Sequence, residues 1–70
     1  MTGGPDNAEI IRTARLLIEE YGDMAPMGAI IRADHLSERG DASGHAVWRR
    51  IARVAEDLLA EQRPEDSQLH

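Results

Sequence analysis

Histidine and carboxylate side chains are concentrated around the second of two Gly-Asp pairs in the chain. They are His35, His45, Asp34, Glu38 and Asp41. Nitrogen and oxygen donors of these types can bind a divalent metal ion, but the two histidines are not four residues apart, the spacing that places two ligands on one helix face. The sequence therefore predicts polar side chains at helix ends here, with no metal and no cofactor.

Nucleophilic catalysis has little support in this sequence, because its serines lie at predicted turns or in the tail without an evident base beside them. The chain has no cysteine and its basic residues are all arginine, so it contains neither a thiolate nor a lysine that could form a Schiff base. A chain of 70 residues also has little room for a pocket that excludes water. We expect no enzyme activity.

Arg49, Arg50 and Arg53 make a second candidate site, because a helix, a glycine turn and an arginine-bearing helix suggest a helix-turn-helix that binds nucleic acid. The net charge of −5 opposes this reading, since it repels phosphate backbones. The spacing after Gly40 would also place Arg49 at a core position, where a charge is costly. Asp57 stands four residues after Arg53, the spacing of a surface ion pair. A nucleic-acid-associated regulator using these arginines is the alternative function, and nucleic acid is a disfavoured partner.

Two apolar stripes run along the middle of the chain, where a helix is expected. One stripe consists mainly of small residues suited to close helix contact: Ala25, Ala29, Ile30, Ala33 and Leu36. The other stripe, Met24, Met27 and Ile31, points away from the core, as in proteins that bury a second surface against a partner. Trp48 lies at the edge of the apolar face of the predicted helix that follows Gly40 and Asp41. It is predicted as a core residue, with a partner anchor as the alternative.

Three predicted helices position these side chains, and the first two meet at a Gly-Asp pair. Asp6 and Glu9 have the spacing of a capping box at the start of the first helix, which Gly22 ends. Its apolar face is expected to contain Ile10, Ile11, Ala14, Leu17, Ile18 and Tyr21. Asp23 is expected to cap the second helix, which runs over about residues 24–39.

A second Gly-Asp pair separates the last two helices. Gly40 is expected to close the second helix, and Asp41 or Ser43 to cap the third, which ends near Gln62 because Pro64 is disfavoured inside a helix. The third helix has a wide apolar arc of Val47, Trp48, Ile51, Ala52, Val54, Ala55, Leu58 and Leu59. Such short connections fold helices back on each other, so the sequence predicts an all-α fold, a small antiparallel three-helix bundle.

The domain organisation and location follow from length and composition. We expect one domain over residues 6–63, between a disordered segment at residues 1–5 and a polar tail at residues 64–70. No apolar run is long enough for a membrane span, and the N-terminus lacks the basic and apolar regions of a secretory signal, so we expect a cytoplasmic protein. A chain this short without cross-links gains stability from oligomerisation. The predicted function is therefore a protein-protein interaction or regulatory module that acts through its second helix, has a protein partner and forms a homo-oligomer.

Three segments of the sequence resemble a family of short uncharacterised bacterial helical proteins. They are ARLLIEEYGD, IIRADHLSERGD and GHAVWRRIARVAEDLL, and the resemblance extends over about residues 8–59. Its most specific part is the second Gly-Asp turn followed by Ala-Val-Trp-Arg-Arg-Ile. The resemblance implies a helical fold and no particular activity. The run from Pro26 to Gly28 departs from the family pattern, because helix-weakening residues stand where helix formers would be expected.

Overall fold

The computed structural model describes residues 6–62, and all regular elements in this range are helical. In chain order they are α1 (Asn7–Tyr21), a 3-10 turn η1 (Gly22–Met24), α2 (Ala25–Glu38) and α3 (Ala42–Gln62). No strand occurs within this range, so the expected all-α class is confirmed for the described residues. The segments expected as a disordered N-terminus, residues 1–5, and a polar tail, residues 64–70, lie outside it.

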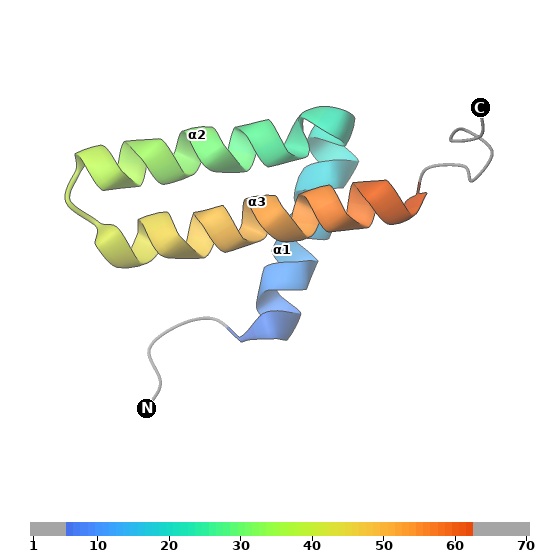
Figure 1. The fold of residues 1–70 in the computed structure, drawn as a ribbon, viewed down its shortest axis with the longest axis horizontal. Coiled ribbons are helices and arrows are strands. Elements are labelled where there is room, and N and C mark those ends of the chain that lie inside the picture. The colour runs from blue at the N-terminus through green and yellow to red at the C-terminus, as the bar shows by residue number, and fades with distance from the viewer. Residues whose placement is uncertain (1–5, 63–70) are drawn as a thin grey trace.

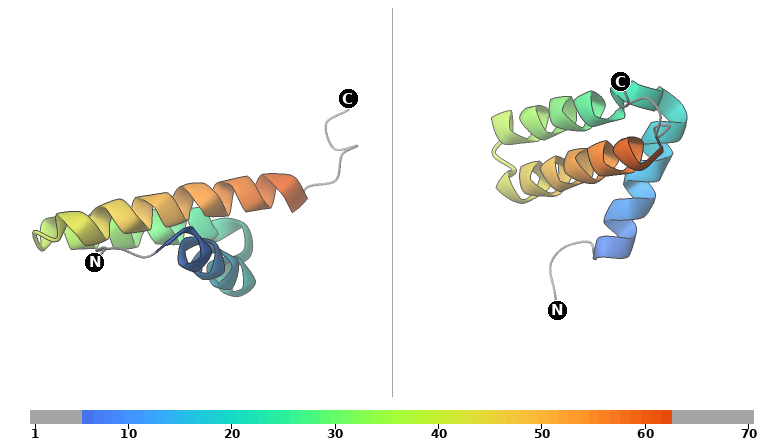
Figure 2. Two further views of the ribbon diagram at one scale, coloured as in Figure 1. Left: turned by 90° about the horizontal axis from the view of Figure 1, so that it is seen from below. Right: turned by 45° about the vertical axis from the view of Figure 1, so that its right-hand side comes forward.

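The helices are arranged as an antiparallel pair crossed by a third element. Helices α2 and α3 run side by side in opposite directions, while α1 crosses them steeply (Figure 1). Figure 2 shows the same crossing from below, where α1 is seen almost end-on against the length of α3. The expected antiparallel three-helix bundle is not confirmed, because only α2 and α3 are aligned with each other.

The two ends of α1 follow the sequence prediction. At its start, the carboxylate of Asp6 accepts a hydrogen bond from the Glu9 backbone N–H at 3.0 Å, which satisfies one of the free donors of the first turn. At its end, Gly22 has a positive φ of 59°, a backbone conformation that glycine adopts without strain. Its N–H donates to the carbonyl of Ile18. Gly22 thus ends α1 and turns the chain out of the helix direction.

The expected cap of the second helix is wrong. Asp23 lies inside η1, and the residue before α2 is Met24, which has a near-helical backbone and makes no side-chain cap. Helix α2 begins at Ala25, with Pro26 in its first turn, where the missing N–H has no helical partner to lose. The 3-10 turn leads into α2 without a residue of extended backbone, so no side-chain cap forms. The same turn sets α1 across the antiparallel pair of α2 and α3.

A Schellman motif closes α2. Gly40 has a φ of 85°, and its N–H donates to the carbonyl of Ser37 at 3.0 Å. The N–H of Asp41 donates to the carbonyl of Leu36 at 2.8 Å. This pair of hydrogen bonds around a left-handed glycine is the standard way to satisfy the last carbonyls of a helix. The predicted role of Gly40 is therefore confirmed.

The same turn starts α3 with a side-chain cap. The carboxylate of Asp41 accepts a hydrogen bond from the Gly44 N–H at 2.8 Å, so Asp41, and not Ser43, is the cap. A Cβ atom on Gly44 would lie 2.6 Å from Asp41 Oδ2 and 3.1 Å from Leu36 Cδ1. The absence of a side chain at Gly44 therefore allows the cap and the end of α2 to meet.

The core is built mainly from alanine. The buried residues are Ile10, Ala14, Ala25, Ala29, Ala33, Ile51, Ala52 and Ala55. Partly buried around most of them are Leu17, Ile18, Ile30, Val47, Trp48, Val54 and Leu58. The prediction is wrong for Ile11 and Tyr21, which are 39% and 54% exposed, because the crossing of α1 brings only a narrow strip of that helix into contact. Small side chains bring the helix axes close together and leave large apolar side chains outside.

Candidate protein-interaction surface

Three large apolar side chains are exposed along α2 and its entry. Met24 is 59% exposed, Met27 54% and Ile31 50%. Spacings of three and four residues place side chains on one face of a helix, so these residues form a continuous stripe, which we call the α2 outer surface. The structure thus places all three residues as predicted, pointing away from the alanine core. Their role in binding a partner stays a prediction.

A shallow groove lies on one side of the α2 outer surface. It has a volume of about 640 Å³, and its apolar lining includes Met24, Met27, Ile30 and Leu59. Glu56 of α3 supplies a charge at its edge. This methionine groove is open and joins the exposed methionines to the side of α3.

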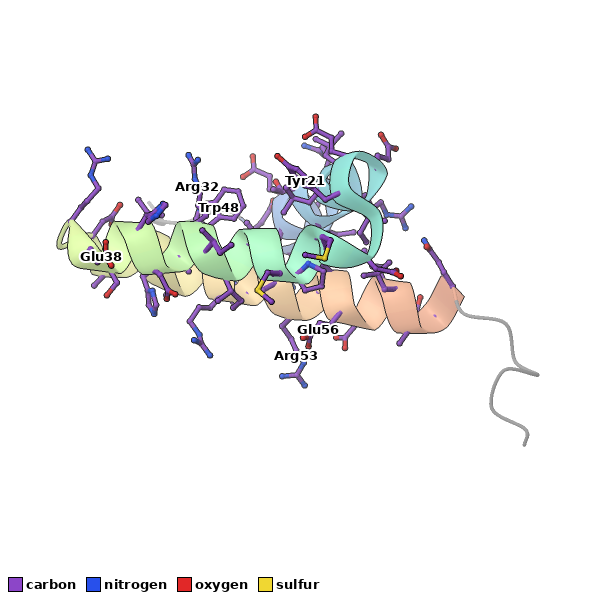
Figure 3. All side chains as sticks on the ribbon, turned by 90° about the horizontal axis from the view of Figure 1, so that it is seen from above. Tyr21, Arg32, Glu38, Trp48, Arg53 and Glu56 are labelled. Atoms are coloured by element: carbon purple, nitrogen blue, oxygen red, sulfur yellow. The ribbon has the colours of Figure 1, made fainter. Side chains whose placement is uncertain are left out.

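A smaller hollow lies on the other side of α2. Its lining includes Tyr21, Gly28, Ile31 and Trp48, and its volume is about 280 Å³. This Tyr21–Trp48 hollow falls below the roughly 300–1,000 Å³ of typical small-molecule pockets. Figure 3 shows Tyr21 and Trp48 on the same flank of α2, with Glu56 on the opposite flank. A protein side chain is a better match for a hollow of this size than a small molecule.

Trp48 joins the core to the surface. Its ring packs against the core as a partly buried side chain, which confirms the predicted core role. It also lines the Tyr21–Trp48 hollow, and the Arg32 guanidinium carbon lies 5.3 Å from its ring centroid. This is within the range of a cation–π contact. Its use as a partner anchor stays a prediction.

Two residues of this region were missed at the level of sequence. Tyr21 was predicted as a core residue, yet its side chain is exposed and lines the hollow together with Ile31. Gly28 was treated as a helix-weakening departure, yet it forms part of the hollow's lining, and a Cβ placed on it would meet nothing within 4 Å. The available signal was the glycine itself: within a helix it costs about 0.5–1 kcal/mol relative to alanine, so its presence there needs a reason.

The arginine face of α3 is engaged within the chain. Arg50 donates a hydrogen bond through Nη2 to Asn7 Oδ1 at 2.7 Å, which ties the middle of α3 to the start of α1. Arg53 Nε lies 3.8 Å from Asp57 Oδ1, so the predicted ion pair is confirmed. Arg49 is exposed on the same helix. All three arginines line one open hollow of about 450 Å³, which the Glu56 carboxylate also lines. A carboxylate at this place opposes the binding of a phosphate, and the nucleic-acid alternative stays a prediction.

The two histidines have different environments. His35 is exposed, as predicted, but the prediction is wrong for His45, which is partly buried, with Nδ1 2.8 Å from the carbonyl oxygen of Ala33. A carbonyl can only accept, so Nδ1 carries the proton and donates. His45 therefore links α3 to α2. Among residues 6–62, no three His, Asp or Glu side chains come together as a potential metal site.

Comparison of the chain with protein-family models, with curated proteins and with solved structures gives no match. The resemblance to short bacterial helical proteins therefore stays a prediction. Within the described part of the chain, every helix is too short or too polar to cross a lipid bilayer.

Proposed function

We propose that this protein is a protein-protein interaction module that binds its partner through the α2 outer surface. One observation carries the proposal: the usual distribution of apolar residues is inverted. The buried core consists largely of alanine, while Met24, Met27 and Ile31 are each at least half exposed. Contiguous exposed apolar surface of this kind typically marks a binding site in a soluble domain.

The energetics favour a protein as the ligand. Each square ångström of apolar surface removed from water contributes about 25 cal/mol, and a flat stripe of side chains is covered most completely by another protein surface. Methionine adapts its side chain to irregular contacts, which suits such an interface. The Tyr21–Trp48 hollow is small for a small-molecule ligand, and the methionine groove, although large enough, is open and would leave much of such a ligand in water. Of the α3 arginines, Arg50 and Arg53 already have partners in Asn7 and Asp57.

The partner also supplies an aligned third helix in this proposal. Helix α1 crosses the α2–α3 pair, so a partner helix laid along α2 would create the antiparallel three-helix packing that the chain alone lacks. We place the interaction in the cytoplasm, since a chain of this size outside the cell ordinarily depends on disulfides and this one contains no cysteine. The proposal assigns no catalytic role.

A matched pair of variants tests the proposal. Ile31→Glu introduces a charge at the C-terminal end of the α2 outer surface, while Leu16→Glu makes the same kind of change at a side chain that is 55% exposed on α1. Each tagged protein is incubated with a native cell extract and with untagged wild-type chain, and the retained proteins are identified. We expect wild type and Leu16→Glu to retain a protein that Ile31→Glu loses, with circular dichroism unchanged. Equal retention by all three proteins would refute the proposal.

A further inference from the structure

We propose that the partner of the α2 outer surface is an acidic amphipathic helix, which places a large apolar side chain in the Tyr21–Trp48 hollow and a carboxylate, one helical turn away, on Arg32. The inference rests on the proposed function and specifies the chemistry of the partner. It is carried by the charges beside the apolar stripe, which have opposite signs in the hollow and in the methionine groove.

The Tyr21–Trp48 hollow combines an apolar lining with cationic groups. Arg32 and His35 line it beside the two aromatic rings, whereas no aspartate or glutamate does. Such a surface is complementary to a ligand that carries a negative charge next to an apolar group. The net charge of −5 opposes this ligand only weakly, because charges more than about 8 Å away are largely screened at physiological salt.

Arg32 is available to bind a carboxylate. Its guanidinium carbon lies 5.3 Å from the Trp48 ring centroid, a cation–π contact that uses no hydrogen-bond acceptor. Within residues 6–62, no side-chain hydrogen bond and no ion pair involves Arg32. No acidic residue stands three or four positions before or after it, where the chain has Gly28, Ala29, His35 and Leu36. Its planar guanidinium can therefore bind a carboxylate of another chain through two parallel N–H···O bonds.

The methionine groove on the other flank of α2 has the opposite charge. Asp23 and Glu56 line it, and no arginine or histidine does. Figure 3 shows Glu56 and Arg32 on opposite flanks of α2, and Arg53, on the flank of Glu56, is paired with Asp57. The hollow thus attracts a carboxylate of the partner and the groove repels it. This difference determines which edge of the partner helix faces each flank.

Gly28 provides room for the apolar side chain of the partner. It lies within α2, where glycine weakens the helix, and it lines the hollow. A Cβ at this position would meet no atom of its own chain within 4 Å, so packing inside the chain does not require glycine here. Bare backbone at this position allows close approach by a ligand.

Selection from a displayed library of helical peptides tests the chemistry of the partner. The peptides are helices of about five turns with leucine along one face, randomised positions beside that face and no tryptophan. We expect wild type to enrich Asp or Glu one turn from a central leucine, and Arg32→Glu to enrich Lys or Arg there. Enrichment without an acidic bias, the same sequences from both proteins, or no enrichment by wild type would overturn the inference.

Trp48 reports whether the hollow is occupied, because it is the only tryptophan in the chain and lines this hollow. The best acidic peptide, and the same peptide with its glutamate changed to lysine, are titrated while tryptophan emission is followed. We expect the acidic peptide to bind wild type at least tenfold more tightly than the lysine peptide, and Arg32→Glu to reverse this preference. Gly28→Leu should weaken binding at least tenfold while helix content is kept.

Arg49→Glu is the matched control, since it makes the same charge change at an exposed arginine of α3. It should bind the acidic peptide like wild type, and a loss equal to that of Arg32→Glu would overturn the inference. A protein captured from cell extract that Ile31→Glu loses and Arg32→Glu retains fully would overturn the acidic-helix inference and leave the proposed function standing. A wild-type dimer in sedimentation velocity that Ile31→Glu abolishes and Arg32→Glu retains would have the same meaning.

Discussion

Replacing Gly28 by alanine should stabilise the monomer, because this glycine lies within helix α2. The new Cβ meets no atom within 4 Å, so no strain opposes the better helix propensity of alanine. The expected gain is about 0.5–1 kcal/mol in the free energy of unfolding, or up to about 4–8 °C in Tm for a domain of this size. Thermal and urea unfolding followed by circular dichroism at low protein concentration measure it.

The same substitution at Gly44 is the matched control. There the Cβ would lie 2.6 Å from the capping carboxylate of Asp41, so Gly44→Ala should lose about 1 kcal/mol as the cap is displaced. Opposite signs for the two glycines are the expected result. A loss of stability in Gly28→Ala at low concentration would refute the reasoning, since it would mean that the chain itself needs this glycine.

Two further predictions concern the connection between α2 and α3. Gly40→Val should cost about 1–2 kcal/mol in urea unfolding, because a branched side chain is strained at a φ of 85°, and an unchanged midpoint would contradict the Schellman closure. His45→Ala should cost about 1–2 kcal/mol through loss of its hydrogen bond to Ala33 and of side-chain packing, whereas the exposed His35→Ala should stay within about 0.5 kcal/mol of wild type. Equal effects of the two histidine substitutions would count against the interhelical bond.

Local signals in the sequence predicted local structure well. The Asp6 cap, the glycine that ends α1 and the Gly40-Asp41 turn each depend on atoms within five residues of one another, so residue type and spacing suffice to identify them. The helical faces that contain Ala14, Ala29 and Ala52 follow from periodicity in the same way.

Features that depend on the path between helices could not be predicted in this way. Asp23 has the right chemistry for a cap, but the chain passes through η1 without the extended backbone that a cap needs. The direction of α1 then decides whether Tyr21 lies in the core or at the surface. The spacing of residues within α1 cannot predict that direction. The outward stripe of Met24, Met27 and Ile31 was predictable because its residues lie close together in the sequence, at the end of η1 and in the first two turns of α2. The hollow beside it was not, since it joins side chains from α1, α2 and α3.

The alanine core restricts how this sequence can change over evolutionary time. Ordinary cores drift by exchanging leucine, isoleucine, valine and methionine at nearly constant volume. Ala29 and Ala52 have no such exchanges, because glycine is the only smaller residue and anything larger would push the helices apart. Substitutions therefore accumulate most readily on the outside of α2. A lineage of such proteins can change the chemistry of this exposed surface while its helical framework stays the same.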